Sequence, residues 1–222
     1  MAAPRLKVTV LISGRGSNLQ ALIDACAASN FPAEIVRVIS NETNAGGLSK
    51  AANAGIPTAV VPHHDYPDRL SFETDLDKEI RRAGTELIAL AGFMRLLTEE
   101  FVDKWQNQLI NIHPSLLPAF KGLQTHKRAI EAGVRFSGCT VHFVRPAMDE
   151  GPIIIQSAVP ISSNDDATSL EARVLAQEHL IYPLALQLIG EGKVRIEGER
   201  AIINDSAEQL PVPTVNPAIP FT

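Results

Sequence analysis

Short apolar runs alternate with amphipathic segments along the first half of the chain. The run Leu6–Ile12 is almost continuously apolar or β-branched, which is typical of a strand buried on both faces of a parallel sheet. After a polar break, Leu19, Leu22, Ile23 and Cys26 recur at helical spacing. The same alternation predicts strands at residues 35–40, 58–61, 87–91 and 109–112, and helices at residues 47–54, 69–83 and 98–105.

The pattern changes in the second half, where longer strand-like runs cover residues 137–144 and 153–161. A helical pattern follows at residues 168–189, and Thr168 with Glu171 has the spacing of a capping box. Pro183 lies inside this pattern. We expect it to kink or divide the helix, because proline removes a backbone hydrogen bond.

Repeated strand–helix alternation favours a sheet covered by helices. We therefore expect an α/β fold with a mostly parallel, Rossmann-like twisted sheet and helices on both faces. A β-rich C-terminal half and a long helix would follow. Ligands of such sheets bind beyond the carboxyl ends of the strands, so candidate chemistry is sought where strands end.

Composition excludes several kinds of partner. The 222 residues are 45% hydrophobic, and their formal net charge of −5 gives no general attraction to nucleic acid or to anionic membranes. Cys26 and Cys139 have no paired spacing, which indicates buried thiols in a reducing compartment and no metal site. The N-terminus lacks a secretion signal, and no apolar stretch approaches the roughly 18 residues of a membrane span. We therefore expect a cytoplasmic protein.

A glycine-rich loop, Ser-Gly-Arg-Gly-Ser-Asn at residues 13–18, joins the first strand to the first helix. Its backbone N–H groups can converge on an anion at the positive end of the helix, and Ser17 and Asn18 add side-chain donors. A dinucleotide fingerprint fits poorly, because Leu19 replaces the third small residue and only Glu42 could serve as the ribose-binding acid. A nucleoside-triphosphate loop is excluded by its missing Gly-Lys-Ser/Thr. A tight turn that binds nothing is the other alternative.

Asn111 and His113 follow each other by two at the end of a predicted strand, so both can face one side. A histidine can exchange a proton near neutrality, and an asparagine amide can donate to a developing oxyanion. Together they suit acyl transfer. A loop carboxylate directed at the histidine would favour its charged form, and Asp149 and Glu150 are both candidates by spacing.

Several motifs give the sequence a family resemblance. They are GRGSNL at residues 14–19, LAGFMR at 90–95, NIHPSLLP at 111–118, GCTVHFV at 138–144, DEGP at 149–152 and QEH at 177–179. In this order they resemble the phosphoribosylglycinamide formyltransferases over roughly residues 6–205. The NIHPSLLP block is shared across formyltetrahydrofolate enzymes, whereas the glycine-rich loop with Ser17 and Asn18 points to the ribonucleotide acceptor.

The resemblance implies that 10-formyltetrahydrofolate is the co-substrate and that no metal takes part. It implies catalytic roles for Asn111, His113 and Asp149. The ribonucleotide and its phosphate would be bound by Gly16, Ser17, Asn18, Leu175, Ala176, Gln177 and Glu178. The folate would be bound by Arg69, Met94, Arg95, Leu96, Leu97, Asn111, Arg145, Pro146, Ala147, Met148 and Asp149.

The resemblance also implies one formyltransferase domain at residues 1–205. Its phosphate-binding half would cover about residues 1–110 and its catalytic and folate-binding half about residues 111–205. A loosely held, Pro-rich tail would occupy residues 206–222. The partners would be small molecules, with neither nucleic acid nor membrane, and the protein would be a monomer or homodimer.

Three other functions share parts of this pattern. A 10-formyltetrahydrofolate hydrolase could use water in place of the amine, although its relatives usually carry a further N-terminal domain. A methionyl-tRNA formyltransferase would need a tRNA-binding extension that this acidic chain leaves no room for. A non-catalytic nucleotide-binding module could use the glycine loop alone. We expect structural roles for the remaining histidines, which are His63, His64, His126, His142 and His179.

Overall fold

A seven-stranded sheet runs through the part of the chain that the computed structural model describes, residues 4–204 and residue 216. Its strands lie in the order β3-β2-β1-β4-β5-β6-β7. They are β1 (Leu6–Ile12), β2 (Ala33–Ser40), β3 (Thr58–Val60), β4 (Leu87–Leu90), β5 (Leu109–His113), β6 (Phe136–Phe143) and β7 (Ile153–Pro160). Strands β1 to β5 are parallel to one another, whereas the pairings of β5 with β6 and of β6 with β7 are antiparallel. The mostly parallel sheet is therefore confirmed.

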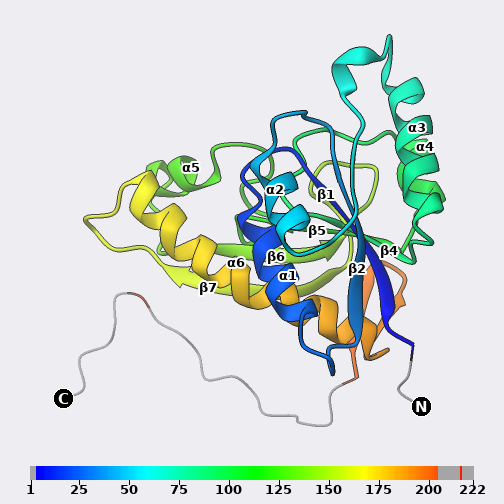
Figure 1. Cartoon of the computed structure of the whole chain (residues 1–222). Helices are drawn as coiled ribbons and strands as arrows, with labels where there is room; N and C mark the ends of the chain where they lie inside the picture. The colour runs from blue at the N-terminus through cyan, green and yellow to red at the C-terminus, as the bar shows by residue number, and fades with distance from the viewer. Residues whose placement is uncertain (1–3, 205–215, 217–222) are drawn as a thin grey trace.

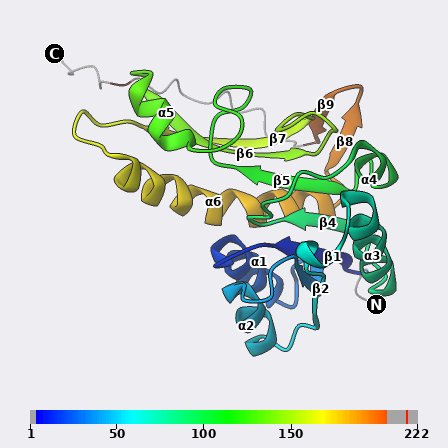
Figure 2. The ribbon, with the colours of Figure 1, turned by 90° about the horizontal axis from the view of Figure 1, so that it is seen from above.

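Helices cover both faces of the sheet, as the alternation of apolar residues predicts (Figures 1 and 2). Val8, Val10 and Ile12 of β1 belong to one buried cluster, and Leu11 belongs to the other, because successive strand residues point to opposite faces. The first cluster is completed by α1 (Ser17–Cys26), α2 (Gly46–Asn53), α5 (Thr125–Glu131) and α6 (Ala167–Gly190), and the second by α3 (Arg69–Arg82) and α4 (Glu99–Lys104).

The β-rich second half extends the same sheet and also forms a small hairpin. Strands β8 (Val194–Glu197) and β9 (Arg200–Ile203) pair antiparallel around Gly198, whose φ of 58° suits glycine in a tight turn. The sequence patterns did not predict this hairpin, because its two strands are short and rich in charge. They also missed the 3₁₀ turn η1 (His63–Asp65), which follows β3.

The long helix α6 differs from its prediction at its first turn. The capping box is formed by Asp166 and Ser169, not by Thr168 and Glu171. The Asp166 carboxylate accepts a 2.7 Å hydrogen bond from the Ser169 backbone, and the Ser169 hydroxyl accepts one from the Asp166 backbone at 3.1 Å. Helix α6 begins at Ala167, so Thr168 already lies inside the first turn. The predicted cap was wrong because Asp166, two positions earlier, starts the helix and caps the backbone N–H of Ser169.

Pro183 does not divide α6, which continues to Gly190. Tyr182, Ala185 and Leu186 beside it are fully buried, and the Tyr182 hydroxyl donates to the Leu90 carbonyl at 2.9 Å. Core packing on both sides of the proline keeps the helix continuous despite the lost hydrogen bond.

The carboxyl ends of β1, β4 and β5 meet at one edge of the sheet, because the three strands are adjacent and parallel. The loop after β1 joins the loop after β4 through a 3.1 Å hydrogen bond from the Ser13 N–H to the Gly92 carbonyl. The predicted tail at residues 206–222 lies outside the described residues, apart from Asn216. Among the residues that the structure describes, no helix combines the length and the apolar character needed to cross a bilayer.

Candidate active site

Gly16 of the glycine-rich loop is the N-cap of α1. Its φ of 69° is left-handed. A Cβ atom at this position would lie 2.7 Å from the Gly47 Cα, so the close approach of α1 and α2 requires glycine. Within the described residues no side chain caps α1, and its first turn contains no acidic residue. The first N–H groups of the helix are therefore free to meet an anion.

Asn18 connects this loop to α6. Its side-chain amide donates a 2.7 Å hydrogen bond to the Glu178 carboxylate, and both residues are buried. The Asn18 Oδ1 atom is also buried and has no hydrogen-bond partner among the described residues. An unpaired buried acceptor destabilises a folded protein by about 1–3 kcal/mol. A ligand N–H or O–H group that reached this atom would remove that cost.

Burial raises the pKa of Glu178, and the charge of Glu171 acts in the same direction. The hydrogen bond from Asn18 opposes these two effects. A carboxyl group with a raised pKa beside an uncapped helix N-terminus is typical of a functional site.

Asn111 lies on β5 directly opposite His142 on β6. The Asn111 Nδ2 atom and the His142 Nε2 atom are 3.3 Å apart, and the His142 Nδ1 atom lies 2.9 Å from the Phe143 carbonyl. Because a carbonyl only accepts, Nδ1 carries the proton and Nε2 accepts from the Asn111 amide. Burial lowers the pKa of His142, which keeps the ring neutral for this role. His142 therefore orients the amide of Asn111.

His113 is held between two acceptors at the end of β5. Its Nε2 atom lies 3.1 Å from the Phe120 carbonyl, and its Nδ1 atom lies 3.4 Å from an Asp149 carboxylate oxygen. The side chains of His113 and Asp149 are 7% and 14% exposed, so this pair is shielded from water. Each nitrogen of the ring therefore faces an oxygen atom of the protein.

The structure distinguishes the two carboxylates that spacing left open. Asp149 faces His113 with one oxygen and accepts a 2.7 Å hydrogen bond from the Gly122 N–H with the other. Glu150 points elsewhere and pairs with the Lys121 ammonium at 2.5 Å. Asp149 has a left-handed φ of 53°, which is uncommon for a residue other than glycine and is often found at functional sites.

A pocket opens beside Asn111 and Asp149 at the carboxyl edge of the sheet. Asn111, His142 and Asp149 bring polar groups to its wall, and the remaining lining is mostly apolar. Its lining residues are Leu90, Phe93, Arg95, Leu96, Leu97, Val102, Asn111, His142, Val144, Arg145, Pro146, Ala147, Met148 and Asp149. An apolar slot with a few convergent polar groups is typical of a small-molecule site.

Comparison of the sequence with known proteins identifies one family. Residues 6–186 match the family model described as formyl transferase. The chain belongs to the formyl transferase family. Over 201 residues it is 42% identical to the phosphoribosylglycinamide formyltransferase of Haemophilus influenzae, covering 90% of this chain and 95% of that protein. It is 50% identical over 192 residues, 86% of this chain, to the trifunctional purine biosynthetic protein adenosine-3 of Gallus gallus, and spans 19% of that longer protein.

Solved structures agree with the sequence relationships. The glycinamide ribonucleotide transformylase 1 of Symbiobacterium toebii is 44% identical, with a TM-score of 0.88, and the match covers 90% of this formyl transferase and 95% of that chain. A formyltetrahydrofolate deformylase from Burkholderia mallei has a TM-score of 0.82 at 29% identity, and the match covers 90% of this chain and 70% of that one. The fold of this chain is thus similar to that of two proteins whose names describe different reactions.

The pocket of this formyl transferase gathers most of the residues predicted to bind folate. Arg95, Leu96, Leu97 and Asn111 line it, together with the loop at residues 145–149. Arg69 and Met94 do not line it. Arg69 is the exposed first residue of α3, and Met94 is 69% exposed with its backbone N–H donating to the Ser13 hydroxyl.

The residues predicted for the ribonucleotide lie at the start of α1 and in the middle of α6, and Asn18 and Glu178 join the two helices. Gly16, Ser17 and Asn18 form the start of α1, and Glu178 reaches Asn18 from α6. Gln177 instead accepts a 3.0 Å hydrogen bond from the Ser157 hydroxyl of β7. Leu175 is half-buried and Ala176 is exposed on the same helix.

The pocket also contains residues that were not predicted to bind folate. His142 is the most informative of them, because the sequence left it as a histidine that could border the site but favoured a structural role. The others are Leu90, Phe93, Val102 and Val144. His142 lies in the GCTVHFV motif, and the pairing of β5 with β6 places it opposite Asn111. This antiparallel register is the information that the sequence patterns did not contain. The buried thiols were predicted correctly, since burial raises the pKa of Cys26 to about 11 and that of Cys139 to about 12.

Proposed function

We propose that this formyl transferase moves the formyl group of 10-formyltetrahydrofolate to the amine of 5-phosphoribosylglycinamide in de novo purine biosynthesis. The products would be formylglycinamide ribonucleotide and tetrahydrofolate. The contact between Asn18 and Glu178 carries the proposal, because it joins an open helix N-terminus to a buried carboxylate at one site. A phosphorylated sugar that also carries an amine needs both kinds of partner.

The ribonucleotide would bind where α1 and α6 meet. Gly16, Ser17 and Asn18 would hold its phosphate with backbone and side-chain donors. Glu178, with the neighbouring segment from Leu175, would meet its ribose and glycinamide portion. The unpartnered Oδ1 atom of Asn18 is an acceptor, so it supports a ligand hydroxyl or amine at this place, beside the phosphate.

The folate would occupy the pocket beside Asn111. Leu96, Leu97 and Met148 offer apolar surface for a flat pterin, and Arg95 and Arg145 offer guanidinium donors. For Arg69 and Met94 the folate assignment rests on the family resemblance alone. Both lie outside the pocket lining, so they would contact a part of the folate that extends beyond the pocket.

The reaction would be a direct transfer with no covalent enzyme intermediate. The neutral amine attacks the formyl carbon, a C–N bond forms, and the carbonyl oxygen becomes an oxyanion. The bond from the formyl carbon to the folate nitrogen then breaks, and the proton lost by the amine passes to that nitrogen. Asn111, oriented by His142, would donate to the oxyanion, and charged His113 would stabilise it and relay the proton.

His113 has to change one contact to do this. Both of its nitrogens face protein acceptors, and it does not line the pocket. We infer that Nε2 leaves the Phe120 carbonyl when substrates bind, while Asp149 keeps the ring charged and oriented at Nδ1. Phe120 has a left-handed φ of 53°, so the loop that supplies this carbonyl is already in an unfavourable conformation.

The wider context of the function follows from the same proposal. Residues 1–205 would act as one domain, with the phosphate-binding half before about residue 110 and the catalytic half after it. The partners would be the two small molecules, the protein would be a cytoplasmic monomer or homodimer, and the transfer itself would need no metal.

One assay tests this function. The protein is mixed with 10-formyltetrahydrofolate, with and without glycinamide ribonucleotide, and tetrahydrofolate production is followed. We expect release that depends on the ribonucleotide. Release without the acceptor would favour the hydrolase, to which the deformylase structure at 29% identity gives some support. No release with either mixture, together with ribonucleotide binding, would indicate a non-catalytic binding module.

A further inference from the structure

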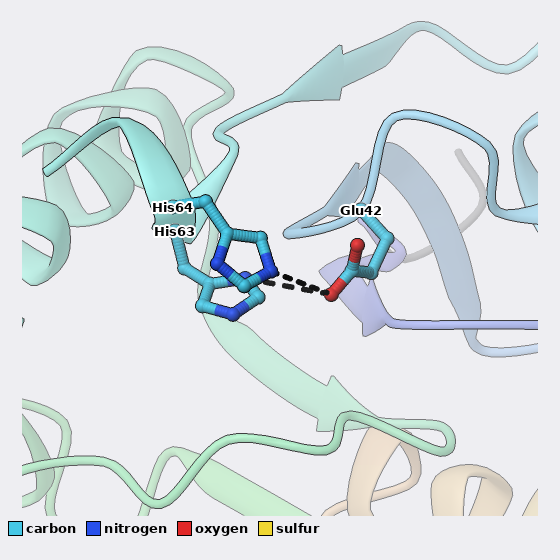
Figure 3. Close-up of side chains that lie close together, drawn as sticks. All are labelled: Glu42, His63 and His64. Carbon is cyan, nitrogen blue, oxygen red and sulfur yellow. Dashed lines mark ion pairs between the residues drawn. The ribbon is translucent and has the colours of Figure 1, made fainter.

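Two imidazoles and one carboxylate come together outside the proposed active site. Glu42 follows β2, and His63 and His64 form the start of η1 after β3, so adjacent parallel strands deliver them to one edge (Figure 3). One Glu42 oxygen lies 3.5 Å from the His63 Nδ1 atom and 4.0 Å from the His64 Nε2 atom. One donor atom from each residue lies within 4.8 Å of the other two.

These separations are close to those of a metal site. Ligand atoms bound to one tetrahedral Zn²⁺ at about 2.0–2.1 Å lie roughly 3.3–3.4 Å apart. A small side-chain rotation would bring the three donors to that spacing. Two imidazoles with one carboxylate suit Zn²⁺, Ni²⁺ or Cu²⁺, whereas Mg²⁺ and Ca²⁺ prefer sites made only of oxygen atoms.

His63 is held in position before any ion arrives. Its side chain is only 8% exposed and packs edge-on against Phe72, with the ring centroids 6.4 Å apart. The His63 and His64 rings also lie close together, with centroids 3.7 Å apart. The two rings therefore present their nitrogen atoms to the same small volume beside Glu42.

The other two donors give an ion access from solvent. The side chains of His64 and Glu42 are 74% and 41% exposed. Among the described residues, Glu42 forms no ion pair with a lysine or arginine, and the two histidines are its ion-pair partners. The carboxylate is therefore available to a cation.

We propose that Glu42, His63 and His64 bind one divalent transition-metal ion of the Zn²⁺ type, with a fourth position open to water. The ion would join the loop after β2 to the turn after β3. It would stabilise this edge of the sheet and take no part in formyl transfer.

The proposed site is next to the glycine-rich loop. The His63 Nδ1 atom also lies 3.0 Å from the Asn41 amide nitrogen and 3.1 Å from the Asn41 carbonyl. The Asn41 side chain in turn accepts a 2.5 Å hydrogen bond from the Ser13 hydroxyl. An ion at His63 Nδ1 would replace its contacts with Asn41 and leave the bond between Asn41 and Ser13 in place.

The test is a titration of the full chain, stripped of metal with a chelator, with Co²⁺ followed by visible absorption and with Zn²⁺ followed by calorimetry. We expect one ion per chain and a higher thermal midpoint in the presence of Zn²⁺. Glu42→Gln and His64→Ala should each weaken binding at least about tenfold and remove the thermal shift. Both side chains are substantially exposed, so both variants should fold.

Asp65→Asn is the matched control. It removes one negative charge from an exposed residue of η1 and leaves the three donors intact, so it should bind Co²⁺ like the wild type. Equal affinity in the wild type, Glu42→Gln and His64→Ala would overturn the proposal, as would the absence of Co²⁺ uptake. Formyl transfer by the metal-free protein is measured separately, so failure of the metal site leaves the proposed function untouched.

Discussion

Asn18 and Glu178 are 160 positions apart in the chain, yet they form a buried hydrogen bond. The bond partly satisfies a carboxylate whose pKa burial raises. A carboxyl group whose pKa is higher in the folded than in the unfolded protein stabilises the fold fully at pH values below its unfolded pKa of about 4.3. This stabilisation is lost as the pH rises through the folded pKa. Glu178 therefore destabilises the folded protein at neutral pH, which is typical of a residue kept for binding.

Glu178→Gln should make the protein more stable at pH 8, because glutamine can still accept from Asn18 and carries no charge. Urea unfolding at pH 8 measures the gain, and at pH 5 the two proteins should differ less. Ribonucleotide affinity should fall about tenfold, because a charge-assisted hydrogen bond is lost. A variant less stable than wild type at pH 8 would contradict this account of Glu178.

His113→Ala should lower turnover by about 10²–10³, the usual effect of removing one stabilising group from an oxyanion site. Ribonucleotide affinity, measured by calorimetry, should stay near that of the wild type, because Asn18 and Glu178 form a separate contact. Cys26→Ala is a control outside the chemistry, since that thiol is buried away from the pocket. Near-normal turnover by His113→Ala would exclude the proposed mechanism.

At the scale of elements, the start of α6 depends on Asp166. Its carboxylate accepts from the Ser169 backbone, and the Ser169 hydroxyl accepts from the Asp166 backbone in return. Asp166→Ala should cost about 1 kcal/mol in the free energy of unfolding, as for other N-cap residues. Thr168→Ala, inside the first turn, should change it by less than about 0.5 kcal/mol. Urea unfolding compares the two, and the reverse order of effects would restore the cap predicted from sequence.

For the whole molecule, three histidines should control stability in mild acid. Burial lowers the pKa values of His126, His142 and His179, so the unfolded chain takes up protons that the folded protein does not. Stability contributed in this way is complete above the unfolded pKa of about 6.5 and is lost as the pH falls toward the folded pKa values. Thermal midpoints should therefore fall between pH 7.5 and pH 5.5.

Glu178 acts in the opposite direction over that range, because its folded form takes up a proton more readily than its unfolded form. Glu178→Gln should therefore show a larger fall in thermal midpoint than the wild type between the same two pH values. A midpoint that rises on acidification in either protein would mean that His126, His142 and His179 do not dominate.

Much of the molecule could be predicted from local patterns. The parallel strands, the helices on both faces and the glycine-rich loop were expected from residue spacing, and Cys26 and Cys139 are buried as expected. The cap of α6 and the hairpin of β8 and β9 were not, because short charged segments carry little periodicity. The pairing of Asn111 with His142 also escaped prediction, since strand register depends on partners far away in the chain.

The sequence by itself determined where strands and helices form and which motifs follow them, because hydrophobic period, glycine and proline act over a few neighbouring residues. Only the tertiary structure decided that Asp149 faces His113 while Glu150 faces Lys121, and that Glu178 meets Asn18. It also decided that Glu42, His63 and His64 lie close together. Such contacts depend on how buried surfaces pack across the sheet, and that packing is settled by the whole chain at once.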